Sequence, residues 1–286
     1  MQLSAALLGL AALVSPSLVS AATPGYHALP WDGRAYNLTV DTLTNKYVKP
    51  TFTPADYITL QYQARPEGYN DDDGALAIGV DDKAATGSNT GSRRSDLFQQ
   101  LEGTADGTTF YRASVMKADA FLNAFDWKLI YLGSGTVEIG VDASASPAKI
   151  YYRTNGTADA KWSTEFVPGT WYNFGFGVEK STGGANTAVE FYTSTGQAEL
   201  AFNLKTEVKA SIVTLDSFHI GLATTLGGTA SMNAKQDVVS FNGMSAEATA
   251  IGAGAPTPAP SEGGAAVVAS STGSGEARSF TFNDRK

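Results

Sequence analysis

Two carboxylates of this sequence stand in segments with the composition of β-strands. Asp96 lies in the run Arg93–Leu97, and Glu138 follows a Gly-rich turn at 133–135. Hydrolysis of a glycosidic bond requires one carboxyl group that gives up a proton and a second, ionised one that activates water or attacks carbon. Two carboxylates on neighbouring strands of a concave sheet could supply both. The ordinary alternative is that each is a solvated group on the outer face of its strand.

The residues around these carboxylates add a cation and aromatic surface. Alternate residues of a strand share a face, so Arg94 is predicted to lie beside Asp96. If residues 134–135 form the turn of a hairpin, Tyr131 lies opposite the second carboxylate, and Trp127 shares the face of Tyr131. A carboxylate beside aromatic rings is typical of a sugar-binding site.

The elements that must position these groups are short β-strands. Six further runs are rich in β-branched and aromatic residues: 57–62, 75–80, 108–115, 149–153, 171–178 and 189–192. Clusters of Gly, Asn, Asp and Ser separate them, and no long stretch of helical periodicity competes outside the N-terminal segment. The pattern predicts an all-β fold with antiparallel strands in a two-sheet sandwich.

The two ends of the chain differ in composition from its middle. Residues 1–21 combine an apolar run with the small residues Val19–Ala21, which is typical of a secretory signal peptide rather than of a membrane span. Residues 249–286 consist mainly of Gly, Ala, Ser, Thr and Pro and are predicted to form a disordered tail. The sequence therefore predicts a secreted, extracellular protein whose one folded domain occupies residues 22–248.

Composition and charge narrow the class of function. The net charge of −8 and the isoelectric point of about 4.8 argue against a nucleic acid or a membrane as partner, and against lyases of acidic uronate chains, whose sites need clustered cations. There is no cysteine, and neither His27 nor His219 stands in a zinc motif. The acidic run 71–73 lacks the spacing of a calcium loop. We expect no metal, no cofactor and a neutral polysaccharide as ligand.

Five motifs in a fixed order resemble the fungal glycoside hydrolase family 131. They are Trp31–Arg34, Arg94–Leu97, Thr136–Ile139, Lys161–Phe166 and Phe218–Leu222, with Gly169–Asn173 after the fourth. The resemblance covers about residues 28 to 248. It implies a secreted β-jelly-roll enzyme that acts on β-1,3, β-1,6 and β-1,4 glucans of plant or fungal cell walls. It places the acidic pair on Asp96 and Glu138.

Other side chains are predicted to contact the sugar. The resemblance implies a cleft histidine at His219, and we expect Arg94 to orient a carboxylate or a sugar hydroxyl. Trp127, Tyr131 and Trp162 are candidates for substrate binding, with packing in the sandwich core as the alternative for the two tryptophans.

Two departures from the family pattern concern the acidic pair. Asp96 stands where the family has Glu, so its carboxylate should lie about 1.5 Å closer to the backbone. A misplacement of that size can lower the rate by about two orders of magnitude. Near Glu138, Trp127–Lys128 replaces an expected His-Gln pair, and Gly140 replaces a Lys. The chain is predicted to be a β-glucanase, or alternatively a catalytically weakened glucan-binding protein, lectin-like or effector-like. A cell-wall structural protein is the third hypothesis.

Two sequons complete the predictions. Asn37 and Asn155 each begin an Asn-x-Thr sequence, which predicts N-glycosylation of exposed surface away from a cleft, because the chain is expected to be exported. We expect the protein to be a monomer.

Overall fold

The computed structural model describes residues 25–49, 53–66, 68–86, 89–104, 107–179, 187–209, 215–225 and 231–249. The predicted signal peptide, and all of the predicted tail except its first residue, lie outside these ranges. Within them, no helix is long and apolar enough to cross a membrane. The described helices are the 3-10 helix η1 (Val40–Asn45) and the single turn α1 (Pro54–Tyr57).

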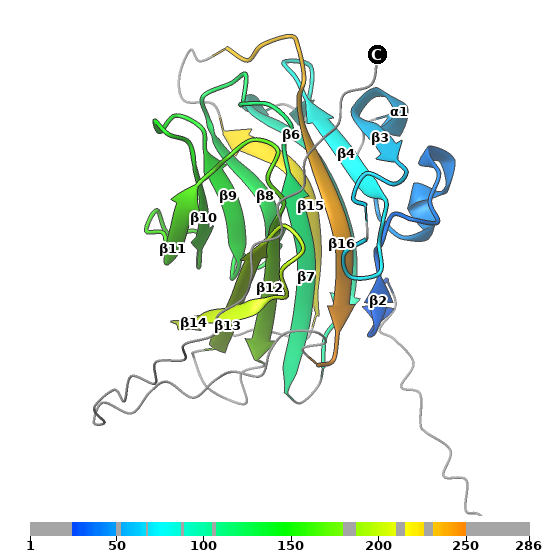
Figure 1. The fold of residues 1–286 in the computed structure, drawn as a ribbon, viewed down its shortest axis with the longest axis vertical. Coiled ribbons are helices and arrows are strands. Elements are labelled where there is room, and N and C mark those ends of the chain that lie inside the picture. Colours follow the sequence, from blue (N-terminus) through cyan, green and yellow to red (C-terminus); the bar gives the residue numbers. More distant parts are fainter. Residues whose placement is uncertain are drawn as a thin grey trace, which may run out of the picture. The chain divides into compact units, whose positions relative to one another are not determined.

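The described strands form two sheets (Figure 1). The first sheet contains, in spatial order, β1 (His27–Ala28), β6 (Asn89–Glu102), β15 (Leu215–Thr225), β8 (Asp126–Leu132), β9 (Glu138–Asp142), β10 (Lys149–Arg153) and β11 (Trp162–Glu165), with β5 (Ala85–Thr86) also on β6. The second contains β14 (Ala201–Val208), β13 (Thr187–Thr195), β12 (Tyr172–Glu179), β7 (Thr108–Met116), β16 (Asp237–Glu247), β4 (Ala75–Val80) and β3 (Ile58–Gln61), with β2 (Trp31–Asp32) also on β16.

These sheets confirm the predicted all-β sandwich. Every strand pair between described residues is antiparallel except the short parallel pair of β1 and β6. Alternating apolar residues of the two sheets meet between them. For example, Tyr152 of β10 stacks on Phe191 of β13 with a centroid distance of 4.4 Å, and both rings are buried. Burial of each such side chain stabilises the fold by about 1.5–3 kcal/mol.

The pairing of β6 with β15 joins distant parts of the sequence. Asp96 pairs with Gly221, and Phe98 pairs with His219. Since β15 also pairs with β8, the segments that carry the predicted site residues form one continuous surface. This surface is the outer face of the first sheet, opposite to the core.

Candidate active site

A β-bulge in β8 decides which side chains reach that outer face. Tyr131 lies opposite Glu138, as predicted, but the register shifts between Lys128 and Ile130. Because one extra residue reverses the alternation of faces, Lys128 reaches the outer face with Tyr131, and Trp127 turns to the core. Lys128 therefore contacts Glu138.

The two tryptophans predicted to bind sugar pack in the sandwich. Trp127 has no exposed surface, and its Nε1 donates a hydrogen bond of 3.2 Å to the Asn123 carbonyl. The prediction that it stacks on sugar is wrong, because the bulge turns its ring inward. Trp162, on the edge strand β11, packs against Phe174 and Phe191. These contacts match the alternative prediction for both residues, which is packing in the sandwich core.

Asp96 is enclosed by three side chains. Arg94 donates hydrogen bonds of 2.6 and 2.7 Å to its two oxygens, the Tyr131 hydroxyl donates one of 2.8 Å, and His219 Nδ1 lies 2.9 Å away. Burial raises the pKa of this carboxyl, but the hydrogen bonds and charges of His219 and Arg94 outweigh it and hold the pKa below its usual value. Asp96 is therefore ionised at neutral pH, yet it has no exposed surface.

His219 occupies the middle of a row of rings across three strands. It stacks on Phe98 of β6 at 5.0 Å and on Tyr131 of β8 at 4.5 Å. Its Nε2 lies 2.8 Å from the Ser217 hydroxyl. Burial raises the pKa of Tyr131 well above its usual value, so this phenol remains a proton donor toward Asp96. Arg94 lies beside this carboxylate, as strand alternation predicts. Tyr131 was expected opposite Glu138 and His219 in a cleft, and the structure brings both to Asp96.

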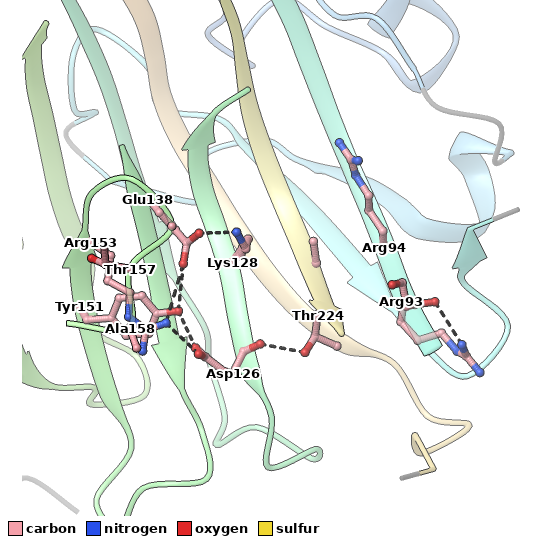
Figure 2. Close-up of a pocket in the computed structure, with 13 residues that line it drawn as sticks. Arg93, Arg94, Asp126, Lys128, Glu138, Tyr151, Arg153, Thr157, Ala158 and Thr224 are labelled. Carbon is pink, nitrogen blue, oxygen red and sulfur yellow. Dashed lines mark hydrogen bonds and ion pairs between the residues drawn. The ribbon is translucent and has the colours of Figure 1, made fainter. Parts of the chain in front are cut away.

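Glu138 is held in a second cluster. Lys128 Nζ lies 2.5 Å from one carboxylate oxygen, and Arg153 Nη1 lies 3.8 Å from the other (Figure 2). The Tyr151 hydroxyl is 3.4 Å from Glu138. A Cβ at Gly140 would lie 2.1 Å from this hydroxyl, so the glycine makes room for the tyrosine where the family resemblance implies a lysine.

A cavity of about 470 Å³ opens on this face beside the two clusters. Its lining comes from β6, β15, β8, β9 and β10 and from the loop after β10: residues Ser92, Arg93, Arg94, Ala223, Thr224, Asp126, Lys128, Glu138, Tyr151, Arg153, Gly156, Thr157 and Ala158. Glu138 contributes to this lining, whereas Asp96 lies beneath Arg94. Only one of the two predicted carboxylates therefore lines the cavity.

The two carboxylates do not lie on neighbouring strands. Strands β15 and β8 separate β6, with Asp96, from β9, with Glu138. Three strand spacings of about 4.8 Å place the two backbones about 14 Å apart. The arrangement considered from the sequence, with the carboxylates on neighbouring strands, is not the one observed, because β15 and β8 both lie between β6 and β9. Side chains from the intervening strands fill the space between the carboxylates.

The chain matches a known family. Residues 29–252 match the model of the family described as the glycoside hydrolase 131 catalytic N-terminal domain. The chain belongs to this family. It is therefore a glycoside hydrolase, as the five sequence motifs indicated, and its substrate is a polysaccharide.

Two solved family 131 structures share the fold. The GH131 beta-glucanase catalytic domain from Podospora anserina has a TM-score of 0.63 and 19% identity, over 78% of this chain and 96% of that one. The catalytic domain of the family 131 protein from Coprinopsis cinerea has a TM-score of 0.61 and 19% identity, over 78% and 95% of the two chains. None of the curated proteins compared with the chain matches it.

Several residues of this family 131 site were not among the sequence candidates. Phe98 shares a strand face with Asp96, and alternation alone could have found it. Lys128 was noted only as a departure from the family, and strand alternation could not place it because of the bulge. Arg153 and Tyr151 carried no local signal, since they reach Glu138 only through the pairing of β10 with β9.

The two predicted glycosylation sites differ in their distance from the cavity. Asn37 and Asn155 are both exposed. Asn155, however, directly precedes Gly156, which lines the cavity. A glycan on Asn155 would therefore border the site, contrary to the expectation that both sequons lie away from a cleft. Glycosylation itself remains a prediction.

Proposed function

We propose that this family 131 member hydrolyses β-glucan and that Glu138 is the carboxyl group that meets the scissile bond. The observation that carries the proposal is the place of Glu138 in the cavity lining, on the same sheet face as the buried cluster around Asp96. The β-1,3, β-1,6 and β-1,4 linkages remain the substrates to be compared. The name of the Podospora anserina structure, a beta-glucanase, supports the choice of a glucan.

In the proposed mechanism the two carboxylates have different roles. A general base must be ionised before the reaction, and the lowered pKa of Asp96 suits that role. Asp96 accepts a proton from the water that attacks the anomeric carbon, and Glu138, which must first be protonated and released from Lys128, donates its proton to the leaving sugar oxygen. The carboxyl groups of inverting enzymes stand about 6.5–9.5 Å apart to admit a water molecule, against about 5–5.5 Å in retaining enzymes. Backbones about 14 Å apart exceed both separations, so the assigned roles require the two side chains to approach each other to within the inverting range when substrate binds.

The export of the protein belongs to the same proposal. A glucan of a plant or fungal cell wall is met outside the cell, which agrees with the predicted signal peptide at 1–21. In this proposal the mature enzyme consists of the catalytic domain at 22–248, followed by the tail at 249–286. N-terminal sequencing of the secreted protein would test the first boundary.

One observation favours a second candidate, a glucan-binding protein with weakened catalysis. Asp96 has no exposed surface and is paired with Arg94, whose side chain is 36% exposed. A base must come within hydrogen-bond reach of water. Asp96 can therefore act only if the Arg94 side chain shifts when a substrate binds. If it does not shift, binding remains and hydrolysis is lost.

Sugar release distinguishes the two candidates. We would incubate the secreted protein with laminarin, mixed-linkage β-glucan and soluble cellulose, beside Glu138→Gln and Asp96→Asn. The matched control is Glu190→Gln, because Glu190 is also paired with a lysine but lies on the second sheet. Release by the parent and the control, lost in both site variants, supports the hydrolase.

The remaining outcomes of this experiment also distinguish the hydrolase from the glucan-binding protein. Glucan binding without sugar release by the parent supports the second candidate. Neither release nor binding would overturn both. NMR of the anomeric proton in the first minutes of reaction tests inversion, because a retained configuration contradicts the assigned roles.

A further inference from the structure

We infer that Tyr151 and Asp126 are positioning residues that hold Glu138 ready as the proton donor. Asp126 binds the proton of the Tyr151 hydroxyl, and the hydroxyl oxygen then accepts a hydrogen bond from protonated Glu138. The inference rests on the proposed hydrolysis and on the acid role of Glu138. Neither positioning residue lies in the motifs that resemble the family.

The Tyr151 hydroxyl lies between two carboxylates of the cavity lining (Figure 2). It donates a hydrogen bond of 2.5 Å to Asp126 Oδ1, and it is 3.4 Å from Glu138 Oε1. A phenol hydroxyl has a single proton to donate. The shorter contact takes this proton, so the oxygen interacts with Glu138 only as an acceptor.

The hydroxyl keeps its proton over the neutral and acidic range. Burial, the hydrogen bond to Asp126 and the charges of the two carboxylates raise the pKa of Tyr151 well above its usual value. An ionised carboxylate, by contrast, has no proton to donate to the hydroxyl oxygen. Only the protonated form of Glu138 can therefore donate a hydrogen bond to Tyr151. The contact favours the form that a general acid needs.

Arg153 and Gly140 fix the place of this hydroxyl. The Arg153 guanidinium lies over the Tyr151 ring, 3.6 Å from its centroid, as in a cation–π contact. A side chain at position 140 would collide with the hydroxyl, since a Cβ there would lie 2.1 Å from it. The lysine that the family resemblance implies at this position would therefore exclude the Tyr151 hydroxyl.

Asp126 also holds the guanidinium away from Glu138. Arg153 Nη1 is 2.7 Å from Asp126 Oδ2 but 3.8 Å from Glu138 Oε1. A cation closer to Glu138 would favour its ionised form. Because the Asp126 side chain is 51% exposed, solvent screens its own charge, and its effect passes mainly through Tyr151 and Arg153.

Lys128 opposes this effect until substrate binds. Its Nζ is 2.5 Å from Oε2, the other oxygen of Glu138, and favours the carboxylate. When Glu138 is protonated and leaves Lys128, it donates a hydrogen bond to Tyr151 until its proton passes to the leaving sugar oxygen. The carboxylate that results pairs with Lys128 again. Other titratable groups around the cavity are Tyr131, opposite Glu138 on β8, and Arg93 and Arg94 on β6.

The pH dependence of hydrolysis tests the inference. In Tyr151→Phe the protonated Glu138 loses its acceptor, so the alkaline fall of kcat should move to lower pH by about one unit, the equivalent of one hydrogen bond. Asp126→Asn should move it in the same direction, because the hydroxyl proton and Arg153 can then turn toward Glu138. A merely structural role would lower kcat by the same factor at every pH, and that result overturns the inference.

Tyr192→Phe is the matched control. The Tyr192 hydroxyl also donates to a glutamate, Glu190, at 3.0 Å, but it lies on the second sheet. Its pH profile should follow that of the parent. A shift in the control equal to that in Tyr151→Phe contradicts the assignment of the effect to this cavity.

A titration of the Glu138 carboxyl tests the same arrangement without turnover. It is followed by NMR of the carboxyl carbon, with the signal assigned from Glu138→Gln. The midpoint should move to lower pH in Tyr151→Phe. A move to higher pH would show that Tyr151 donates to Glu138, and an unchanged midpoint would show no coupling; either result overturns the inference.

The two tests separate this inference from the proposed function. If the parent hydrolyses no glucan, the proposed function fails, and the carboxyl titration still decides whether Tyr151 favours protonated Glu138. Hydrolysis by the parent with unchanged pH profiles in Tyr151→Phe and Asp126→Asn overturns this inference alone.

Discussion

Arg94 holds Asp96 through two parallel hydrogen bonds, from Nε and Nη2 to the two carboxylate oxygens, at 2.6 and 2.7 Å. The carboxylate has no exposed surface, whereas the guanidinium is partly exposed. In this arrangement the arginine shields the carboxylate from solvent and balances its charge. The pair therefore affects both the stability of the fold and the access of substrate to Asp96.

The stability of the protein should depend on pH through Asp96. Its folded-state pKa is lowered, chiefly because the hydrogen bonds from His219 and Arg94 outweigh the effect of burial. The resulting stabilisation is fully present above the unfolded pKa of about 3.9 and is lost as the pH falls through the lower folded pKa. Urea unfolding of the parent and of Asp96→Asn should differ by about 3 kcal/mol at neutral pH, and the difference should narrow in acid. A difference independent of pH would contradict the charge state assigned to Asp96.

Lengthening this carboxylate should increase the rate of hydrolysis. Asp96→Glu moves the carboxyl group about 1.5 Å further from the backbone, and we expect kcat on β-glucan to rise by up to about 100-fold. The extra methylene in a buried site should cost about 1–3 kcal/mol of stability, so the assay is run well below the unfolding temperature. Glu138→Asp is the matched comparison, since it withdraws the other carboxylate by the same length and should lower kcat. An unchanged or lower kcat in folded Asp96→Glu would speak against Asp96 as the base.

Trp127 should contribute to stability and not to sugar binding. Replacing its buried ring by the smaller one in Trp127→Phe leaves part of the site empty and should lower the free energy of unfolding by about 1–2 kcal/mol. KM for glucan should stay within twofold of the parent. Tyr131→Phe provides the contrast, because it deletes the hydroxyl that donates to Asp96 and should lower kcat. An increase in KM for Trp127→Phe alone would show that the ring reaches the substrate.

Gly221 should resist substitution because the paired strand β6 runs very close beside it. Its φ is +151°, and a Cβ there would lie 2.3 Å from the Ser95 carbonyl oxygen and 2.4 Å from the Asp96 Cα. Gly221→Ala should therefore cost at least about 2 kcal/mol and lower activity by displacing Asp96. Gly135→Ala is the control, since its φ is +74° but nothing lies within 4 Å of the added carbon. Equal urea midpoints for the two variants would contradict this explanation.

The local geometry of the site could be predicted from the sequence. Arg94 and Asp96 lie side by side because residues two apart in a strand share a face. Tyr131 lies opposite Glu138 because a short Gly-containing turn sets the register of its hairpin. Runs rich in β-branched and aromatic residues, separated by clusters of turn residues, likewise predicted the sandwich. These relationships involve residues close in the chain, so their periodicity is visible before folding.

The bulge in β8 had no comparable signal. Strict alternation assigned Trp127 to the face of Tyr131, and the extra residue between Lys128 and Ile130 reversed that assignment. The physical cause is packing, because the Trp127 ring is buried against Phe121 and Phe125 in the core. Because of this single shift of register, Lys128 lies beside Glu138 on the outer face, where the Trp127 ring had been predicted.

The sequence by itself determined that this chain is a β-sandwich of glycoside hydrolase family 131, because strand periodicity and ordered motifs are properties of the chain. Only the tertiary structure decided which side chains meet. In the folded protein, β15 lies between the strands of the two carboxylates, Arg94 covers Asp96, and Arg153 and Lys128 lie next to Glu138. The physical reason is that the order of strands in a sheet is settled by the packing of the whole core, which no short segment encodes.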